Sequence, residues 1–567
     1  MAAWRMFFVN LTNGGDDMKT YADRPWLDHM DPKITKNPSL PDIPVHQLLT
    51  ESAKKFPNHT ALYFYGTKFS YTELETLTTG LAKSITELGI AKGDRVAIYM
   101  DNCPQYVIAF FAVLKAGAAV VQVPPMLAER ELSYLIADSG ARAIFTLDYL
   151  LPKVKTVMSG SSLQFAVSSS LFDYLPPDPI PSRPFGIPQQ ALPFEPAAGV
   201  HEFKSLIGNA GDYSSPAINN KKDLAVIQYT SGTTGFAKGV MITHHNLASY
   251  VTMLQYMDYK NEPGKEIYPV TLPMFHNYGM FQTVVAPLAM GGKVIIMVRF
   301  HPEEALMMID QLRPTIFRAV PTMLIMMMNH PKIKEFNLSS IRHWIVGGAP
   351  VPDELVAKFN EISGANVVEG YGLTESTSGV VLNSLYEKTH KGMGFPAILT
   401  DARVVDLTTG EDVPLGADGE LLLKGPTISI GYWGKPEETA KTFKDGWLHT
   451  GDIVRMTEQG VLQFVDRLKE MVIVSGFNVY PTEVEGVLYE YPGVLECAVI
   501  GWPDERQGEV VKAFIVPKPD VNLDASQIIN FCKERLSAYK VPKLVEIVGS
   551  LPKNPTGKIL KKELKKK

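Results

Sequence analysis

The chain has 567 residues, a length that accommodates about three or four units of ordinary domain size with large buried cores. Apolar residues make up 45% and charged residues 20%, which excludes a wholly disordered, fibrous or collagen-like protein. The net charge of −5 gives no sign of a nucleic-acid-binding surface, so an anionic ligand would need a local site. The three cysteines, Cys103, Cys497 and Cys532, form no CxxC motif, which argues against a disulfide scaffold or a thiolate zinc site and favours a reducing, cytoplasmic compartment.

The amino-terminal residues do not look like an export signal, because Arg5 is followed by only four apolar residues before Asn10. The longest apolar run, residues 106–114, has nine residues, far fewer than the roughly 18 that a membrane span needs. We therefore expect no transmembrane segment. A peripheral membrane contact and a homodimer both stay open.

Helix and strand patterns alternate along the first part of the chain. Strands are expected over 95–99 and 118–121, with a helix over 104–116 between them; this order is typical of a parallel sheet with helices on its faces. Eight of the 21 residues from 176 to 196 are proline, so an extended surface connection is expected there. The alternation resumes with a strand over 224–229.

The pattern changes in the last third of the chain. Short strands separated by turns between residues 400 and 465 predict a small antiparallel sheet or barrel. After Asp466-Arg467, a unit of about 100 residues has strands of its own over 496–500 and 513–516 and helices over 481–490 and 525–536. We therefore expect an α/β protein with a large domain over residues 1–465 and a smaller one over residues 466–567.

The strongest motif runs from Thr230 to Gly239, where seven of the ten residues are Gly, Ser or Thr. It follows a predicted strand, so successive backbone N–H groups and hydroxyls can turn onto a phosphate, with Lys238 adding positive charge. It is not a P-loop of the GxxxxGK[ST] kind, because two residues separate Gly232 from Gly235 and a glycine follows the lysine. A mobile polar linker is the alternative interpretation, and the position between a strand and a predicted helix argues against it.

This segment resembles the phosphate loop of the acyl-adenylate-forming (AMP-binding) superfamily, which contains acyl-CoA synthetases, peptide-synthetase adenylation domains and beetle luciferases. The resemblance extends from about Arg24 to Leu564 through several ordered motifs. It implies a large N-terminal domain of stacked α/β sheets plus a small β-barrel, capped by a smaller mobile α+β C-terminal lid domain. It also implies that the nucleotide contacts of this loop are Thr230, Ser231, Gly232, Thr233, Thr234, Gly235 and Lys238.

A second motif, Gly370-Tyr371-Gly372-Leu373-Thr374-Glu375, combines two glycines with a hydroxyl and a carboxylate. The glycines let the backbone approach a ligand closely, and nucleotide-bound Mg²⁺ prefers one or two carboxylates. Glu375 is therefore a candidate metal ligand and Thr374 a candidate phosphate donor; the resemblance implies the same roles and a stacking of Tyr371 on adenine. A glycine turn with a helix cap is the alternative. The segment ending in Gly348-Ala349-Pro350 resembles the family's strand end on the adenine side.

Three further positions complete the expected nucleotide and acid site. Asp452 can accept hydrogen bonds from both ribose hydroxyls, and Arg467 supplies a second ribose or phosphate contact. His276, in the sequence Pro273-Met274-Phe275-His276, corresponds to the position where the family has an aromatic residue or a histidine beside the carboxylate substrate. A purely structural histidine is the alternative interpretation.

The carboxy-terminal unit is expected to contribute a catalytic lysine. Joining a carboxylate to the α-phosphate of ATP brings two anions together, and a mobile cation that bridges them meets that need. The resemblance assigns this role to Lys558. Thioester formation brings the coenzyme A (CoA) thiol to the same carbonyl, so a lid that changes pose is expected. The resemblance places its hinge at Lys469 and implies that Ser475, Gly476 and Phe477 would line the CoA channel after the lid turns.

The resemblance is strongest to medium- and long-chain fatty acyl-CoA synthetases. It implies an ATP- and Mg²⁺-dependent ligase whose partners are ATP, CoA and an aliphatic carboxylic acid, with no nucleic acid. An aryl-CoA ligase and an acyl-AMP ligase that loads a carrier protein stay open. A non-catalytic nucleotide- or fatty-acid-binding paralogue is disfavoured, because binding alone needs neither the metal contact of Glu375 nor the mobile Lys558.

Overall fold

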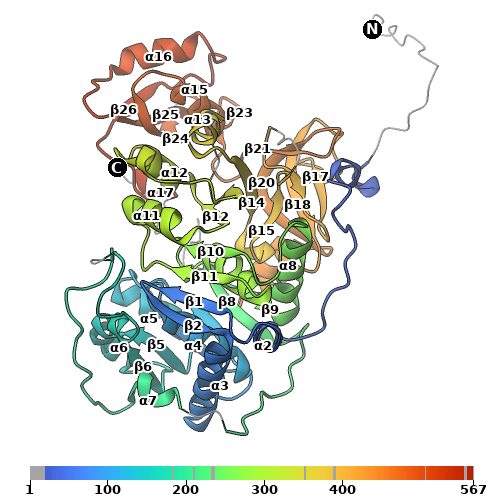
Figure 1. The fold of residues 1–567 in the computed structure, drawn as a ribbon. Helices are drawn as coiled ribbons and strands as arrows, with labels where there is room; N and C mark the ends of the chain where they lie inside the picture. The colour runs from blue at the N-terminus through green and yellow to red at the C-terminus, as the bar shows by residue number, and fades with distance from the viewer. Residues whose placement is uncertain are drawn as a thin grey trace, which may run out of the picture.

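The computed structural model describes residues 20–181, 184–208, 211–230, 237–349, 351, 353–386, 391–504, 506–553 and 558–565. The described residues form five sheets with helices packed against them. Four of the sheets are built from residues before 468, and the fifth from residues after it. The red carboxy-terminal sheet lies at the top of Figure 1, and most of the blue and cyan amino-terminal elements lie at the opposite end, whereas the short dark-blue helix α1 (Trp26–His29) lies near the orange strands. Among the described residues, no helix combines the length and the apolar composition needed to cross a bilayer.

The largest sheet has seven strands, which are parallel except for the last. In spatial order they are β7 (Val200–Glu202), β6 (Phe165–Ser169), β5 (Ala143–Leu147), β3 (Arg95–Tyr99), β4 (Ala119–Gln122), β8 (Leu224–Thr230) and β9 (Lys238–Thr243). The helix α4 (Pro104–Lys115) connects β3 to β4 and is buried on every side, because it packs between this sheet and α3 (Tyr71–Glu87). The expected strand–helix–strand order is confirmed.

Two smaller sheets with parallel cores follow. One contains β10 (Ile267–Val270), β11 (Lys293–Ile296), β1 (Thr60–Phe64) and β2 (Thr67–Ser70). The other contains β12 (Ile316–Ala319), β13 (His343–Val346), β14 (Asn366–Gly372), β15 (Gly379–Leu382) and β16 (Phe395–Pro396). The helices α11 (Pro302–Leu312), α12 (Pro321–Met328) and α13 (Asp353–Ser363) accompany the second of them. Because β12, β13 and β14 are parallel, their carboxyl ends meet at one edge, where ligands bind in open α/β sheets.

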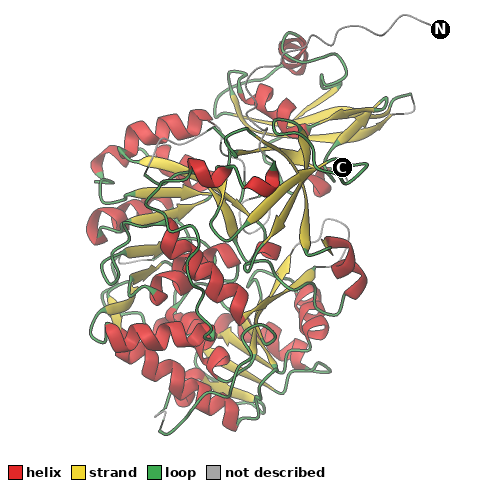
Figure 2. Cartoon of the chain, turned by 90° about the vertical axis from the view of Figure 1, so that its right-hand side faces the viewer, coloured by secondary structure: helices red, strands yellow, loops and turns green. Residues whose placement is uncertain are grey.

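The expected antiparallel sheet is present between residues 401 and 467. It contains β17 (Asp401–Val405), β18 (Asp418–Lys424), β20 (Trp447–Met456), β19 (Phe443–Lys444) and β21 (Leu462–Arg467). Figure 2 shows the strands of the chain in yellow with the helices packed around them in red. Asp466 and Arg467 are still paired within β21, so the sheet ends at the turn formed by residues 468–470.

The fifth sheet contains β23 (Phe477–Val479), β22 (Val472–Val474), β25 (Gly508–Pro517), β24 (Val494–Asp504) and β26 (Leu544–Ile547). The helices α15 (Pro481–Tyr489), α16 (Ala525–Lys533) and α17 (Lys561–Leu564) complete this unit. It has its own buried clusters, in which Val472, Val499 and Ile515 are members of one and Phe514 and Leu564 of another. A separate core is what an independently folding unit requires.

The segment that is expected to bind phosphate connects two strands. The residues before and after it are Thr230, which ends β8, and Lys238, which begins β9, and these two residues pair in an antiparallel register. The following helix α8 (His244–Met257) is capped by Thr243, whose Oγ1 accepts a hydrogen bond from the Asn246 N–H at 3.1 Å. The sequence pattern predicted the helix but not β9, because a strand with glycine at its second position has little strand signal.

Candidate functional site

A cavity of about 1420 Å³ lies between the carboxyl ends of the strands and the carboxy-terminal unit. Its lining contains residues from four sheets and from the segment after residue 467. The residues singled out in the sequence that line it are Thr230, Lys238, His276, Gly348, Ala349, Gly370, Tyr371, Gly372, Thr374, Glu375, Asp452, Arg467, Lys469 and Lys558. Ser231, Gly232, Thr233, Thr234, Gly235 and Pro350 lie outside the described residues.

One wall of the cavity carries a hydrogen-bonded group formed by Tyr371, Asp452 and Arg467. Asp452 in β20 and Arg467 in β21 are opposite each other in the antiparallel register, and Arg467 Nε lies 3.2 Å from Asp452 Oδ1. The Tyr371 hydroxyl donates to Asp452 Oδ2 at 2.6 Å. Asp452 is only 2% exposed, so both partners stabilise a carboxylate that would otherwise be costly to bury. Each carboxylate oxygen retains a further acceptor position for a ligand hydroxyl.

Burial shifts the pKa of the tyrosine hydroxyl on this wall. Burial, and then the adjacent carboxylate of Asp452, hold the pKa of the Tyr371 hydroxyl well above its ordinary value. The tyrosine therefore stays a neutral hydrogen-bond donor at physiological pH, and Asp452 presents its negative charge toward the cavity.

Another part of the cavity lining contains the charged residues Glu375 and Lys238, both of which contact Tyr432. The Tyr432 hydroxyl donates to Glu375 Oε1 at 2.7 Å, and the Lys238 ammonium lies 5.2 Å from the centre of the Tyr432 ring. Lys238 also forms an ion pair with Glu438 at the start of α14 (Pro436–Thr442). Glu375 itself is in a short 3₁₀ turn after β14, where its carbonyl accepts a hydrogen bond from the Ser429 N–H at 2.8 Å.

The glycines at the strand ends allow backbone segments to approach one another. A Cβ atom on Gly372 would lie 2.1 Å from the carbonyl oxygen of Ser378, and one on Gly347 would lie 2.8 Å from that of Gly370; both distances are too short for any other residue. Gly348 has a φ of +81°, a conformation that glycine adopts without steric cost. The close approach expected at Gly372 is therefore made to the chain's own hairpin.

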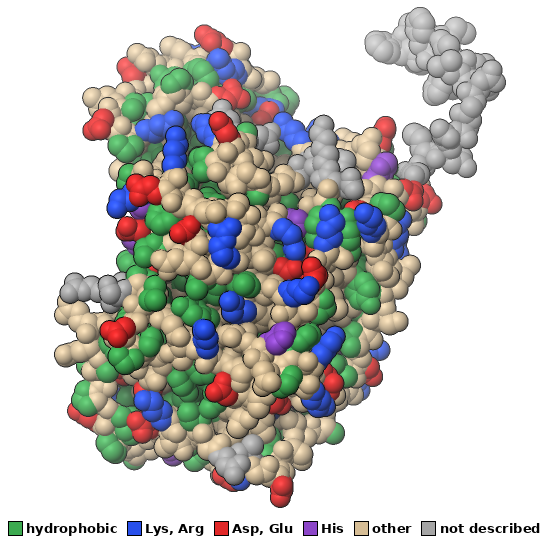
Figure 3. Space-filling model, viewed as in Figure 1, with side chains coloured by type: hydrophobic (Ala, Val, Ile, Leu, Met, Phe, Trp, Pro, Cys, Tyr) green, Lys and Arg blue, Asp and Glu red, His purple; other side chains and the backbone are tan. Residues whose placement is uncertain are grey.

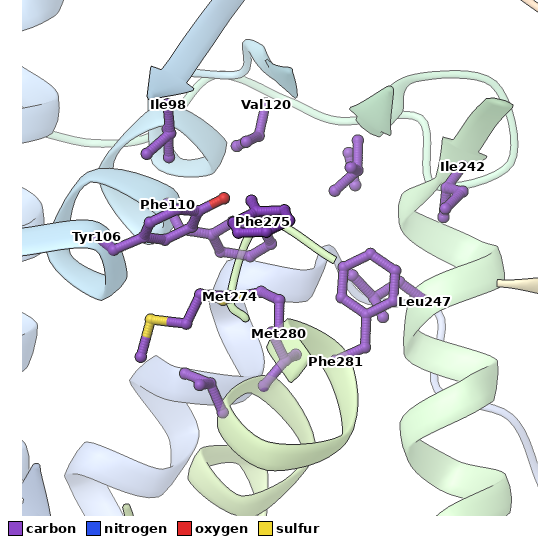
Figure 4. Close-up of a cluster of buried hydrophobic side chains, with 14 of the residues drawn as sticks. Ile98, Tyr106, Phe110, Val120, Ile242, Leu247, Met274, Phe275, Met280 and Phe281 are labelled. Atoms are coloured by element: carbon purple, nitrogen blue, oxygen red, sulfur yellow. The ribbon is translucent and has the colours of Figure 1, made fainter. Parts of the chain in front are cut away.

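His276 is held in position by its neighbours. The preceding residues Met274 and Phe275 are buried in the cluster drawn in Figure 4, beside Tyr106, Phe110 and Phe281. His276 caps α9 (Asn277–Met280), and its Nδ1 accepts a hydrogen bond from the Tyr278 N–H at 3.2 Å. Nε2 therefore carries the proton of the neutral ring.

Buried amide side chains fix the same loop, and sequence analysis did not identify them. Asn102 Oδ1 accepts from the Met274 N–H at 2.7 Å, Gln122 Nε2 donates to the Met274 carbonyl at 2.5 Å, and Gln228 Nε2 donates to the Phe275 carbonyl at 3.1 Å. The signal available in the sequence was that each amide lies within or just after an apolar strand.

Burial also lowers the pKa of His276 to about 4, so the ring is neutral at physiological pH.

The carboxy-terminal unit brings Lys558 to the wall that carries Asp452 and Arg467. Burial, and then the adjacent Arg467 guanidinium, lower the pKa of the Lys558 ammonium to about 8, although Glu470 and Asp452 act in the opposite direction. Three residues further on, Lys561 Nζ lies 2.8 Å from Glu485 Oε1 and 3.2 Å from Glu470 Oε2. These ion pairs attach the segment that carries Lys558 to α15 and to the turn that contains Lys469.

Asp466, which precedes Arg467, is bound to backbone groups on either side of the turn after β21. Its Oδ2 accepts a hydrogen bond from the Thr482 N–H at 2.8 Å, and its Oδ1 accepts one from the Arg467 N–H at 2.6 Å. Burial raises the pKa of its carboxyl to about 6. The carboxylate thus connects the last residues of β21 to the start of α15.

Ser475, Gly476 and Phe477 do not line this cavity. They form the turn between β22 and β23, where Ser475 and Gly476 have φ values of +51° and +85°. Phe477 is 58% exposed and stacks on Tyr539 with the ring centres 5.0 Å apart. In this pose of the carboxy-terminal unit, the expected CoA contacts are separate from the residues expected to form the adenylate.

Comparisons with known proteins give matches along almost the whole chain. A family profile described as AMP-binding enzyme matches residues 49–433, and one described as AMP-binding enzyme C-terminal domain matches residues 483–558. A long-chain-fatty-acid–CoA ligase of Bacillus subtilis (strain 168) is 38% identical over 547 residues, which cover 96% of this chain and 98% of that protein. A feruloyl-CoA synthase of Amycolatopsis is 36% identical over 518 residues, which cover 91% and 97%.

Among solved structures, MatB from Rhodopseudomonas palustris matches this chain in two states. Its ATP-bound crystal structure gives a TM-score of 0.82 at 27% identity, covering 92% of this chain and 99% of that one. Its apo crystal structure gives a TM-score of 0.72 at 28% identity over the same shares of both chains. The present chain is thus more similar to the ATP-bound than to the apo structure of the same protein.

Proposed function

Because the chain belongs to the family of AMP-binding enzymes, we propose that it is an ATP-dependent acyl-CoA ligase for an aliphatic carboxylic acid of medium to long chain. In the first half-reaction a carboxylate oxygen attacks the α-phosphorus of ATP, and pyrophosphate leaves. In the second half-reaction the thiol sulfur of CoA attacks the acyl carbonyl, and AMP leaves. The observation that carries the proposal is a single cavity lined by Asp452, Glu375 and Lys558.

The nucleoside would bind to the wall formed by Tyr371, Asp452 and Arg467. Asp452 accepts hydrogen bonds from the ribose hydroxyls, and Arg467 keeps that carboxylate oriented, as their separation of 3.2 Å supports. Adenine lies against Tyr371, with Gly348, Ala349 and Pro350 beside it. The phosphates are received by Thr374 and by the segment from Thr230 to Gly235, with Lys238 neutralising charge.

Glu375 is the residue that fits Mg²⁺ bound to the nucleotide. Among the described residues there is no group of three or more His, Cys, Asp or Glu side chains that could hold a metal ion by itself, whereas Mg²⁺ is usually held by one or two carboxylates together with phosphates. Tyr432 donates to Oε1 of Glu375 and so orients the carboxylate, and Oε2 would be the oxygen that contacts the ion. When bound, the ion would neutralise phosphate charge as pyrophosphate develops.

Lys558 is the cation that would bridge the two reacting anions. Its pKa of about 8 leaves most of the ammonium protonated at pH 7, so it neutralises the carboxylate and the α-phosphate as they approach. The neutral His276 presents Nε2–H to the acid carboxylate and helps to orient it. The acyl chain extends past Met253, Met257 and Met328, which line the cavity and whose flexible side chains adapt to different chains.

The second half-reaction would require the carboxy-terminal unit to turn. We place the domain boundary at the end of β21, with 1–465 as the large domain and 466–567 as the lid, and the hinge at Lys469. Ser475, Gly476 and Phe477 would then face the cavity and line the CoA channel. The greater similarity to an ATP-bound relative supports an adenylate-forming pose of the lid, in which Lys558 is in the site and this turn is not.

An aryl-CoA ligase is the second candidate, because a feruloyl-CoA synthase is among the similar proteins. The deciding experiment measures pyrophosphate release over straight-chain acids from acetate to palmitate, with benzoate and ferulate as aryl acids, in the presence and absence of CoA. We expect CoA-dependent turnover with aliphatic acids. Turnover restricted to aryl acids would favour the second candidate, and no release with any acid would contradict both.

Lys558→Ala is the matched variant in that screen, with Lys562→Ala in the following helix α17 as its control. Lys562 is exposed, so its variant should retain activity. Lys558→Ala should slow adenylation by roughly 10²- to 10³-fold, the usual cost of losing one charge-stabilising group, and should largely spare thioester formation from supplied acyl-AMP. Equal losses in both half-reactions would contradict the assignment of Lys558 to the first.

A further inference from the structure

The part of the cavity assigned to the acyl chain contains a buried positive charge. Arg318 in β12 is 7% exposed and lines the cavity. Its Nε donates to the Gln282 carbonyl at 3.2 Å, and among the described residues the guanidinium has no ion-pair partner. The buried guanidinium of Arg342, by contrast, pairs with Asp258 and Glu266. A buried charge without a counter-ion costs several kcal/mol, and an apolar acyl chain would not offset that cost.

A second donor lies near Arg318. Tyr250 in α8 is fully buried and lines the same cavity; its hydroxyl is close to the Ser378 side chain and the Gly379 backbone but forms no well-aligned hydrogen bond with a described residue. A Cβ atom placed on Gly379 would lie 3.2 Å from Gln282 Nε2 and 3.8 Å from the Tyr250 hydroxyl. These polar groups therefore meet around a glycine, which leaves open the space that a side chain would fill.

Within this polar group, Gly379 lies beside the Tyr371 backbone, since a Cβ on it would be 3.7 Å from the Tyr371 carbonyl oxygen, whereas Gln282 lies further from the residue expected to orient the acid carboxylate. Gln282 follows His276 by six residues along α9 and the following helical turn, a distance of about 9 Å at the helical rise per residue. Met253 and Met257 in α8, one and two turns beyond Tyr250, line the same cavity and can contact methylene groups.

We propose that Arg318 and Tyr250 bind a second carboxylate at the far end of the substrate, so that the preferred acid is a medium-length α,ω-dicarboxylic acid. A guanidinium presents paired donors that match both oxygens of a carboxylate, and the Tyr250 hydroxyl supplies a further donor. This inference rests on the proposed ligase function and specifies its substrate class.

The test compares acids of equal length that differ only at the far end: octanoate with suberate, and decanoate with sebacate. The quantity measured is the ratio of kcat/KM for the diacid to kcat/KM for the monoacid, from CoA-dependent pyrophosphate release by the full chain. We expect a ratio above one for the wild type. In Arg318→Met the ratio should fall by roughly 100-fold, as expected when a buried charge pair loses one member. Arg318→Lys should restore part of it.

Tyr250→Phe removes only the hydroxyl and should lower the same ratio several-fold. Arg403→Met, which removes an arginine from the surface of β17, is the control and should leave the ratio unchanged. A wild-type preference for monoacids would overturn the inference, as would a ratio that neither Arg318→Met nor Tyr250→Phe changes. If Arg318→Met does not fold, the wild-type and Tyr250→Phe ratios decide the question. Turnover of no acid at all would instead contradict the ligase function.

Discussion

The protonation state of a side chain in the cavity depends on its burial and on the charged groups next to it. Lys558 is one of seven lysines in the last 15 residues; of those that the structure describes, only this one is buried next to Arg467 and Asp452 with a pKa near 8. A lysine whose pKa is lowered keeps its charge below that pKa and loses it as the pH rises through it.

The first prediction follows from that titration. In the adenylation half-reaction, kcat/KM for ATP reports groups of the free enzyme, so it should fall about tenfold per pH unit above about pH 8. Lys558→Arg carries a guanidinium that stays charged throughout this range, and its residual activity should show no such decline. Pyrophosphate release measured across the pH range distinguishes the two enzymes, and identical declines in both would mean that another group titrates.

The second prediction concerns Glu375. Glu375→Gln keeps the size of the side chain and its acceptor for the Tyr432 hydroxyl, but removes the negative charge. The Mg²⁺ concentration for half-maximal adenylation should therefore rise by at least about tenfold, since one charged ligand is lost. Tyr432→Phe, which leaves the carboxylate in place without its 2.7 Å hydrogen bond, should raise it by less. An unchanged Mg²⁺ requirement in Glu375→Gln would count against the metal contact.

At the scale of elements, the site depends on strands that end at the same edge and on hairpins packed tightly beside them. The motif Gly370-Tyr371-Gly372 directs Tyr371 to the cavity because the two glycines allow β14 to lie against its neighbours. At Gly372 the neighbour is the backbone of Ser378, 2.1 Å from where a Cβ would be. The requirement for glycine is therefore structural at this position.

The third prediction tests that requirement. Gly372→Ala should lower the free energy of unfolding by about 1–3 kcal/mol, the usual cost of overpacking against backbone that cannot move freely. It should also weaken ATP binding, because Tyr371 is displaced. Gly549→Ala, where a Cβ would meet no atom within 4 Å, should change stability by no more than about 0.5 kcal/mol. Urea denaturation of both variants gives the comparison, and equal stabilities would show that the hairpin relaxes.

At the scale of the whole molecule, the cavity lies between two units with separate cores. The connection between them is the turn after β21, where the Glu470 N–H donates to the Arg467 carbonyl at 2.9 Å. Charged side chains of both signs are interspersed over the face shown in Figure 3, and the cavity lining contains the charged residues Asp452, Arg467 and Lys558.

The fourth prediction concerns this connection. Proline fixes φ near −65° and restricts the residue before it, so Lys469→Pro should hold the lid in whichever pose that backbone allows. If adenylation proceeds in the present pose, the variant should give a burst of pyrophosphate with retained acyl-AMP and little acyl-CoA. Lys469→Ala, which keeps the backbone free, should complete both half-reactions. Single-turnover assays of each half-reaction provide the test, and parallel losses accompanied by a lower Tm would indicate mere destabilisation of the turn.

Local patterns predicted most of the elements that form the cavity. Apolar runs bounded by turns predicted β3, β8 and the antiparallel sheet, and helical patterns predicted α4 and α8. They did not predict β9, because its pairing with β8 depends on a partner rather than on its own composition. The amides of Asn102, Gln122 and Gln228 were also missed, since a buried amide shows its function only through the backbone groups that it contacts.

The sequence by itself determined the α/β class, the order of the motifs and the residue types that can bind a nucleotide, because these depend on local periodicity and on the chemistry of single side chains. Only the tertiary structure decided which of those residues share one cavity. It paired Asp452 with Arg467 through strand register, buried Lys558 beside them and left Phe477 exposed. It also left Arg318 without a counter-ion among the described residues, an isolation that no local pattern can show because a charge is paired or unpaired only through residues distant in the sequence.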